Sequence, residues 1–467
     1  KFTRPGESVR LDENPSTGPF YSRLFVDDIN QAADVTDWSS DYINEIFMHF
    51  YIRIMEVSSL LRDSAANRVL CESFKGEWSS AVAAANHKGR RVAFFSQFLY
   101  FISGAALYFL SFFLVALSAL ILPGVVLFTR RRSFLEVSPE FAVVRSPASY
   151  DKMRFLIDSG GVAFYYDDLL QRKPSAASIY SLGGASERIF SLFIIPLLTL
   201  RDYFKVMNDA RRLVGWCYTG FVLYYFSKRM AHKCSFEYYF NLLIKRSKPE
   251  TYYTGNKEDR FAILEKRLCR KYAVRSVCVP HGIEYAFRTP AGLVGDVFYC
   301  TTEHARQHLS GLYPDAQAFI FDECIAQRMF SRCKARSPAT EIVFFPESRG
   351  IDVNLSILKH LLGLGYRISV KLHPKDNLEN YREYADQVAF LHDFDAAISN
   401  KICLARKSTV LVEAIYNNSV PIAILADPRD RGYVEHMLPS LVDDQIIRVY
   451  SFEELAGVLD GLHIPLY

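Results

Sequence analysis

The sequence predicts an α/β protein with two Rossmann-like domains and a hydrophobic, membrane-associated helical insertion in the first of them. Three observations support this prediction. Short apolar segments rich in β-branched residues alternate with helical patterns, a polar segment divides this alternation into two series, and one long run contains no charged residue. Strands that alternate with helices at this spacing are typical of parallel, doubly wound sheets.

Length and composition are those of a chain that forms globular cores. The 467 residues suffice for two domains, and 50% of them are hydrophobic while 23% are charged. A net charge of +4 is too small for a dedicated nucleic-acid binder. The nine cysteines are scattered, which argues for a reducing compartment and against a disulfide framework or a zinc site. The 36 Phe and 28 Tyr favour contact with a membrane surface.

The N-terminal part divides into an arm with a helix and the first α/β domain. We expect residues 1–62 to form the arm and helix, with the arm over 1–40 and helical periodicity from Trp38 to about Leu61. The first domain covers 63–335. Its expected strands are Arg68–Ser73, Arg91–Ser96, Phe141–Arg145, Val162–Tyr166, Thr251–Thr254, Ser276–Pro280 and Val297–Cys300, and its expected helices are Trp78–Ala85, Tyr150–Asp158 and Asp259–Lys271.

The hydrophobic insertion lies at 97–129, within a run from Ala93 to Phe128 that has no charge. Basic residues precede it (Lys88, Arg90, Arg91) and follow it (Arg130, Arg131, Arg132). The positive-inside rule places both ends on the cytoplasmic side, which a single span cannot satisfy. Two helices of about 15 residues would each be only about 22 Å long. We therefore favour a shallow re-entrant or interfacial hairpin that breaks near Pro123-Gly124. One transmembrane helix and a buried helix pair remain alternatives.

A second apolar patch extends from Arg188 to Arg229 and is interrupted by basic residues such as Arg201 and Lys205. We expect its helices to be too short and too interrupted to span a membrane. Basic residues beside Trp216 suit a helix that lies on anionic lipid. A buried core helix is an equal alternative.

The second domain covers 336–467 and follows a polar linker at Ser331–Thr340. Its expected strands and helices alternate as in the first domain. The strands are Ile342–Phe345, Arg367–Leu372, Ile402–Leu404 and Pro421–Leu425, and the helices are Asn354–Leu362, one that starts near Ser408, and Phe452–Leu459. In open α/β sheets ligands bind outside the carboxyl ends of the strands, which here lie at the cleft between the domains.

Candidate catalytic residues follow strands of the first domain. His281 is followed by Gly282, and a histidine there can act as a general base near neutral pH. The alternative is a loop histidine that bonds a backbone carbonyl. Asp168, with Asp167, is a candidate acceptor-side base, and a solvated charge pair is its alternative. Asn256 and Glu258 are further acceptor-side candidates.

Candidate donor-binding residues follow strands of the second domain. Lys371 and His373 offer positive charge and hydrogen-bond donors to phosphate, with Pro374 fixing the turn. Ser408 and Thr409, after Lys407, supply hydroxyls and free amides at the expected start of a helix, which favours an anion.

Two further groups belong to the same donor side. Glu413 lies one helical turn after Thr409 and is expected to accept from ribose hydroxyls. Glu347, Ser348 and Arg349 follow the first strand of the domain and are expected to hold donor base or phosphate. Ordinary loops and a simple N-cap are the alternatives on this side. The sequence has no Walker A, G-x-G-x-x-G, H-E-x-x-H or D-x-D motif, so we expect neither a metal nor a cofactor.

The motifs VPHGIEY, GDVFYCTTEHARQHL, IVFFPES, ISVKLHPKD and ARKSTVLVEAIYNNSVPIAI follow one another between Thr251 and Ile424. In this order they resemble the bacterial capsule and teichoic-acid transferases, which include CDP-glycerol glycerophosphotransferases, polysialyltransferases and capsule Kdo transferases. The resemblance implies a GT-B-like fold, a catalytic base at His281, and donor-phosphate contacts at His373, Ser408 and Thr409. The Ser-Thr pair departs slightly from the Ser-Ser pair common in the group.

The resemblance also implies a CMP- or CDP-linked donor and an inverting displacement without a metal. We therefore expect a membrane-associated glycosyltransferase at the cytoplasmic face of the bacterial inner membrane. Its partners would be a nucleotide sugar, a glycan or glycolipid acceptor of a surface polysaccharide and the membrane surface, without nucleic acid. A CDP-polyol phosphotransferase and a non-catalytic polysaccharide assembly protein are the alternatives. A sugar-nucleotide epimerase shares the architecture but would not need a membrane insertion.

Overall fold

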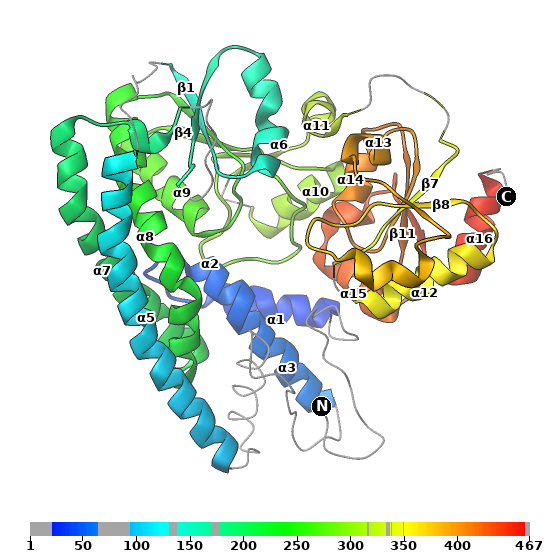
Figure 1. The fold of residues 1–467 in the computed structure, drawn as a ribbon, viewed down its shortest axis with the longest axis horizontal. Coiled ribbons are helices and arrows are strands. Elements are labelled where there is room, and N and C mark those ends of the chain that lie inside the picture. Colours follow the sequence, from blue (N-terminus) through cyan, green and yellow to red (C-terminus); the bar gives the residue numbers. More distant parts are fainter. Residues whose placement is uncertain are drawn as a thin grey trace.

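The computed structural model describes residues 21–63, 94–129, 138–169, 177–314, 317–332, 337, 339–348 and 350–462. Two α/β units lie side by side, and a layer of long helices flanks the first unit on its outer side (Figure 1). The expected elements Arg68–Ser73 and Trp78–Ala85 lie outside the described residues.

The first unit is built on a six-stranded sheet with the order β2-β1-β3-β4-β5-β6, and all neighbouring strands are parallel. Its strands are β1 (Glu140–Val144), β2 (Val162–Tyr166), β3 (Thr251–Thr254), β4 (Arg275–Cys278), β5 (Val297–Tyr299) and β6 (Ala318–Ile320). The central strands are largely apolar and buried, as expected for a sheet covered on both faces.

The second unit repeats this architecture with the strand order β12-β11-β10-β7-β8-β9, again fully parallel. Its strands are β7 (Ile342–Phe345), β8 (Ile368–Val370), β9 (Ala389–Phe390), β10 (Ile402–Ala405), β11 (Val420–Ile424) and β12 (Ile447–Val449). The predicted fold class, two Rossmann-like units in a GT-B-like arrangement, is therefore confirmed.

Helices cover these sheets. They are α6 (Pro147–Asp158), α9 (Arg260–Tyr272), α10 (Glu303–Leu312), α11 (Glu323–Phe330), α12 (Ile351–Gly363), α13 (Phe394–Ile398), α14 (Val410–Ile415), α15 (Pro428–Met437) and α16 (Phe452–Gly461), with short 3-10 helices η2 (Ile179–Ser181), η3 (Leu378–Tyr384) and η4 (Pro439–Val442).

The N-terminal segment differs from the prediction. Part of the expected arm is helix α1 (Arg23–Asp34), which Ser22 caps and which buries Phe25 and Ile29. The expected helix from Trp38 instead starts at α2 (Ile43–Ile46), passes through a π-helical turn η1 (Phe47–Tyr51) and continues as α3 (Ile52–Asp63). Over Arg23–Asp34 the arm prediction was wrong, because the apolar residues of α1 repeat at helical spacing and pack against α15 of the second unit. Residues 1–20 lie outside the described residues.

The hydrophobic insertion is a single helix, α5 (Phe94–Thr129), which passes through Pro123 and Gly124 without a break. The predicted hairpin is therefore wrong, and so is the predicted strand Arg91–Ser96 from Phe94 onward. The last turns are held because Val126 is fully buried and Arg188 donates to the carbonyl oxygens of Val126 and Leu127 at 2.8 and 2.9 Å.

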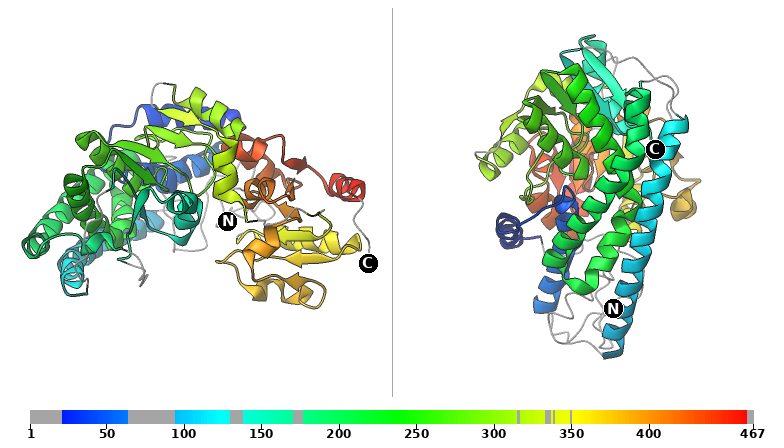
Figure 2. Two further views of the ribbon diagram at one scale, coloured as in Figure 1. Left: turned by 90° about the horizontal axis from the view of Figure 1, so that it is seen from above. Right: turned by 90° about the vertical axis from the view of Figure 1, so that its left-hand side faces the viewer.

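The second apolar patch forms two long helices, α7 (Ala185–Val214) and α8 (Trp216–Ser247), so the prediction of short helices was wrong. Together with α5 they form one layer beside the first sheet (Figures 1 and 2). The inner part of α8 shares a hydrophobic core with β1, β2 and β3. Of the described helices, α5 alone is long and apolar enough to cross a membrane, over Phe101–Phe128.

Helices α5 and α8 approach closely where Gly220 faces Gly104. A Cβ atom at position 220 would overlap the carbonyl oxygen of Gly104 and lie 3.2 Å from the backbone nitrogen of Tyr108. We expect Gly220→Leu to push α5 away from α8 and to lower the free energy of unfolding by about 1–3 kcal/mol. Urea unfolding measures this loss. Gly311→Leu is the control, because a Cβ atom at position 311 would have no neighbour within 4 Å, and an equal loss there would contradict the packing argument.

Candidate active site

The carboxyl edges of the two sheets face each other. Segments that follow strands of the first sheet contact the segments that follow helices α14 and α15 in the second unit. Thr301, after β5, accepts a hydrogen bond from Tyr416 Oη at 3.3 Å, and its hydroxyl lies 2.9 Å from that of Ser440. Glu284, after β4, accepts from Thr301 and Ser440. One hydrophobic cluster contains residues of both sheets, including Val144 and Phe345. The carboxyl edge of the first sheet is therefore in direct contact with the second unit.

His281 lies at the carboxyl edge of the first sheet, and its imidazole is exposed. Its Nδ1 is 2.6 Å from the carbonyl oxygen of Gly255. A carbonyl oxygen can only accept, so Nδ1 carries the proton and donates. The other ring nitrogen, Nε2, then holds a lone pair that faces away from this bond. A neutral imidazole in this tautomer is oriented to accept a proton at Nε2.

Glu258 and Lys257 line a narrow pocket with Glu284, Tyr285 and Phe287. Glu258 is also close enough to His281 for the two side chains to interact electrostatically. Lys257 Nζ is 3.7 Å from Glu258 Oε2 and donates to a backbone carbonyl oxygen. Burial raises the pKa of Glu258. Its charge interaction with His281 keeps Glu258 among the acceptor-side candidates. Asn256 is buried and donates to Thr254 and Glu265, which indicates a structural contact.

Asp167 and Asp168 are both buried, so the alternative of a solvated charge pair is wrong. Ser178 Oγ donates to Asp168 at 2.5 Å. Asp167 accepts from Tyr180 at 2.6 Å and lies 2.8 Å from His232 Nε2. Burial alone would raise the pKa of Asp167, but His232 and Arg145 lower it overall. Both carboxylates line a small pocket with Arg145 and Tyr166 at the ends of β1 and β2, where Asp168 remains a candidate base.

Lys371 and His373 follow β8 on the opposite edge. The backbone N–H of Lys375 donates to His373 Nδ1 at 3.1 Å, so the proton of the neutral ring lies on the exposed Nε2. Burial and then the neighbouring Lys375 lower the pKa of His373, which favours this neutral donor form. The side chain of Lys371 makes no hydrogen bond or ion pair with the described part of the chain, and its ammonium group is available to an anion.

Asp430 forms a buried charge cluster with Arg406 and Lys407, which directly follow β10. Asp430 binds Arg406 through both carboxylate oxygens and Lys407 at 2.8 Å. Arg406 also donates to the carbonyl oxygen of Gly350 and to Asn354, each at 3.1 Å. Gly350 has φ +66°, and a Cβ atom there would collide with the guanidinium group. Asp430 was not among the residues predicted from the sequence. Its position shortly after strand β11 was the one sequence feature that could have indicated it.

Glu347 lies against the same cluster. Burial raises the pKa of its carboxyl group, although Lys407 and Arg406 oppose this effect. Ser348 is half-buried beside Glu347, whereas Arg349 lies outside the described residues.

Ser408 and Thr409 precede a helix that is very short. Helix α14 starts at Val410 and has only six residues, so it provides little aligned dipole. Ser408 Oγ accepts from the backbone N–H of Val410 at 3.4 Å, while Thr409 makes no side-chain capping bond. Glu413 is paired at 2.8 Å with Lys152 of α6, across the two units. Lys152 was missed because the sequence gives no sign of this long-range pairing.

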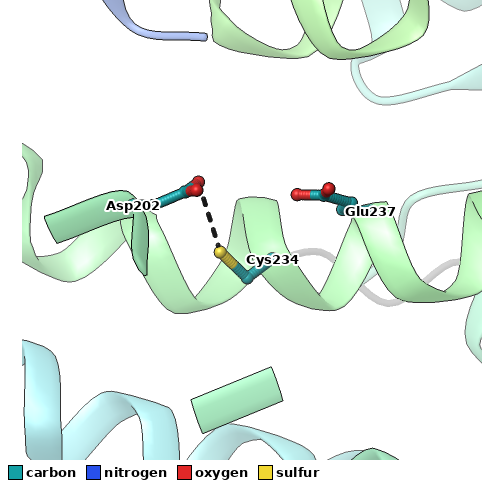
Figure 3. Close-up of side chains that lie close together, drawn as sticks. All are labelled: Asp202, Cys234 and Glu237. Atoms are coloured by element: carbon teal, nitrogen blue, oxygen red, sulfur yellow. Dashed lines mark hydrogen bonds between the residues drawn. The ribbon is translucent and has the colours of Figure 1, made fainter. Parts of the chain in front are cut away.

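Asp202, Cys234 and Glu237 lie close enough together for a metal ion (Figure 3). Their charges are already balanced by protein cations. Lys233 is fully buried and contacts Asp202 at 2.8 Å and Glu237 at 3.0 Å. Burial raises the pKa of Cys234, with Asp202 adding to this effect, so the thiol stays protonated and donates to Asp202. We therefore interpret this group as part of a buried ion-pair network.

The remaining members of this network are Asp41, Arg201 and Arg267. Arg201 contacts Asp202 and Glu237, and Arg267 contacts Asp41 and Glu237, at 2.8–3.1 Å. Lys233 also binds Asp41. Three carboxylates thus meet three cations. The network joins α7, α8 and α9 to the segment before α2, and it positions the helix layer on the first unit.

Because of this ion-pair network, we expect the folded protein to lose stability in acid. Burial alone would raise the pKa of Asp41 and Glu237, but Lys233 and Arg267 lower both overall. Because the folded-state pKa lies below the unfolded value of about 4, this stabilisation is present at neutral pH and declines as pH falls below about 4–5. We expect Glu237→Gln to be less stable at pH 7 and to lose less stability between about pH 5 and pH 3.

Thermal unfolding across this pH range measures the difference. Glu383→Gln, at an exposed position of η3, is the control and should follow the wild-type profile. An unchanged acid slope in Glu237→Gln would contradict the prediction.

Comparisons with known proteins identify no family. No protein-family model and no curated protein match the chain. Among solved structures, UDP-GlcNAc 2-epimerase from Methanocaldococcus jannaschii aligns with a TM-score of 0.39 and 9% identity, over 69% of this chain and 91% of that one. The Neisseria meningitidis UDP-GlcNAc 2-epimerase bound to UDP-GlcNAc gives 0.40 and 10%, over 69% and 90%. Likeness at this level carries no functional argument, and the fold is assigned from the two sheets.

Proposed function

We propose that the protein is a glycosyltransferase that moves a sugar from a nucleotide-activated donor, CMP- or CDP-linked, to a hydroxyl of a surface polysaccharide or its lipid-linked precursor. The proposal rests on one observation about two histidines at the facing sheet edges. One of them presents a hydrogen-bond acceptor, and the other presents a hydrogen-bond donor. His281 presents an acceptor nitrogen, because Gly255 holds its Nδ1–H. His373 presents a donor N–H, because Lys375 occupies its Nδ1. One edge suits proton removal, and the other suits binding of a leaving phosphate.

The chemical step follows from these states. His281 Nε2 takes the proton of the acceptor hydroxyl, whose oxygen forms a bond to the anomeric carbon of the donor sugar. The bond from this carbon to the phosphate oxygen breaks, and the nucleotide leaves with the electron pair. His373 and Lys371 stabilise the charge on the departing phosphate. A single displacement inverts the anomeric configuration and needs no covalent enzyme intermediate.

The buried cluster around Asp430 supports the donor side in this proposal. Asp430 holds Arg406 and Lys407 in place, and Ser408 and Thr409 follow them directly in the chain. Glu347, Ser348 and Arg349 are the proposed contacts to the donor base or phosphate. Glu413 acts through its pair with Lys152, which ties the two units together and so sets the width of the cleft.

Thermal stabilisation by CMP, CDP, UDP, GDP and ADP tests the donor assignment. At a nucleotide concentration about 100 times the dissociation constant, we expect stabilisation of about 2.7 kcal/mol by a cytidine nucleotide alone. Lys371→Met and His373→Ala should each weaken this shift, whereas His392→Ala, at an exposed site after β9, should not. A selective shift with UDP or GDP would overturn the cytidine assignment. No shift with any nucleotide would favour the non-catalytic alternative.

A further inference from the structure

The outer face of the helix layer carries many exposed apolar side chains. On α7 they form one stripe, which starts with the adjacent Ile189 and Phe190 and continues every three or four positions with Phe193, Leu197, Leu200 and Phe204. On α5 they extend from Phe101 to Phe128 and include Phe109, Phe113, Leu117 and Leu120. Phe113 is 72% exposed and Phe193 is 65% exposed. The two helices pack against each other. We call the exposed apolar side chains of both helices the α5–α7 face.

The packing of α5 excludes a membrane crossing in this fold. The inner side of α5 belongs to the core of the first unit, because Val126 is buried in the same cluster as Phe141 of β1 and Tyr252 of β3. Helix α8 lies along α5 and contributes the buried Lys233 to the ion-pair network. A membrane-crossing α5 would bring α8, its charges and part of the sheet into hydrocarbon. Burial of charged groups there is costly.

A basic and an aromatic residue, Arg211 and Trp216, lie at one end of the α5–α7 face. Arg211 continues the α7 stripe by two turns beyond Phe204 and lies 5.2 Å from the ring of the exposed Trp216. The α5 helix itself has no charged residue, and in the sequence three basic residues precede it and three follow it. Basic residues and tryptophan at the edge of an apolar face are typical of helices that lie in the headgroup region of anionic bilayers.

We propose that the α5–α7 face docks on an anionic phospholipid bilayer, with the axis of α5 parallel to the membrane plane and only its outer side inserted. The inference is independent of the transfer chemistry, since no residue of the sheet edges takes part in it. It predicts that the first unit sits directly on the lipid surface, from which a lipid-linked acceptor would be reached.

Vesicle flotation of the full-length protein tests the docking. We expect binding to vesicles that contain phosphatidylglycerol and much weaker binding to pure phosphatidylcholine vesicles. Phe113→Glu and Phe193→Glu should each weaken binding by about tenfold or more, because each removes a large apolar side chain from the lipid contact. Leu378→Glu, which changes an exposed apolar residue of η3, should leave binding unchanged. Nucleotide binding by all variants should persist, which separates this test from the test of the proposed function.

The depth of α5 in the bilayer tests its orientation. Nitroxide-bearing residues at positions 102, 113 and 128, introduced without using the native cysteines, report depth by paramagnetic accessibility. In-plane docking predicts equal depths, about 5–10 Å below the headgroups. A crossing helix would place position 113 near the bilayer centre and the other two near its surfaces, since about 17–22 Å of helix separates them; that profile would overturn the proposal.

Two further outcomes also overturn it. Absence of vesicle binding, with the label at position 113 already inaccessible to water in the free protein, would show that protein covers this face. A dimeric mass in light scattering, lost in Phe113→Glu, would identify a second copy as the occupant.

Discussion

Replacement of His281 by glutamine is expected to lower the rate of sugar transfer by about 10²–10⁴-fold, the contribution typical of a positioned general base. The amide of glutamine retains a donor that can reach the carbonyl oxygen of Gly255, but it has no basic nitrogen in place of Nε2. The loss should appear in kcat, because the donor contacts lie on the opposite sheet edge. Initial rates at saturating donor measure it.

The matched control for this variant is His304→Gln, which changes an exposed histidine of α10. It should transfer at the wild-type rate. The nucleotide-induced thermal shift of His281→Gln should equal that of the wild type. A variant that loses nucleotide binding together with transfer would place His281 in donor binding and contradict its assignment as the base.

Replacement of Lys233 by methionine is expected to destabilise the fold by about 3–5 kcal/mol, the loss typical when one partner of a buried ion pair is removed. Burial alone would lower the pKa of Lys233, but Asp202, Asp41 and Glu237 raise it overall, so the buried ammonium group is charged. Without it, three carboxylates share the two arginines at the border of the network. Methionine fills a similar volume, so the loss is electrostatic in origin.

Urea unfolding compares Lys233→Met with Lys228→Met, which removes an exposed cation from the same helix. The control should change stability by less than about 0.5 kcal/mol. Adding Asp202→Asn to Lys233→Met should restore part of the loss, because the two residues interact directly. Equal losses of stability in Lys233→Met and Lys228→Met would contradict the proposed network. So would a double variant whose loss equals the sum of the losses caused by Lys233→Met and Asp202→Asn alone.

The sheets were largely predictable because their strands are short apolar segments bounded by polar turns. The predicted strands Val162–Tyr166, Thr251–Thr254 and Ile342–Phe345 coincide with β2, β3 and β7. Strands β6, β9 and β12 were not predicted. Each has only two or three residues and lies at the edge of its sheet, where apolar periodicity is too short to detect.

The helix layer was predicted poorly, because hydrophobicity does not identify the partner of a helix. The uncharged run suggested membrane insertion and Pro123 suggested a break, whereas one side of α5 packs on α7 and α8. The basic residues beside Trp216 suggested a surface helix, and a buried core helix was an equal alternative. Lys233 is buried only because Asp41 and Asp202 converge on it from distant parts of the chain, and no local pattern indicates this.

The candidate site was predicted less completely than the sheets and better than the helix layer. Polar residues directly after strands indicated the facing edges, so His281, Lys371 and His373 were identifiable from position alone. Their protonation states depend on backbone atoms of Gly255 and Lys375, which only the folded structure brings into contact. Asp430 and Lys152 act through side chains that are remote in sequence, and neither follows a strand directly.

The central claim is tested most directly by the mass of the product formed from a panel of CMP- and CDP-linked donors with a bacterial membrane lipid extract. The account predicts an acceptor mass increased by one sugar residue, one equivalent of nucleotide released for each transfer, and neither product with His281→Gln. An increase by a polyol phosphate would replace the proposal with polyol-phosphate transfer. Donors that remain intact throughout, together with no nucleotide-induced stabilisation, would contradict the assignment as a transferase.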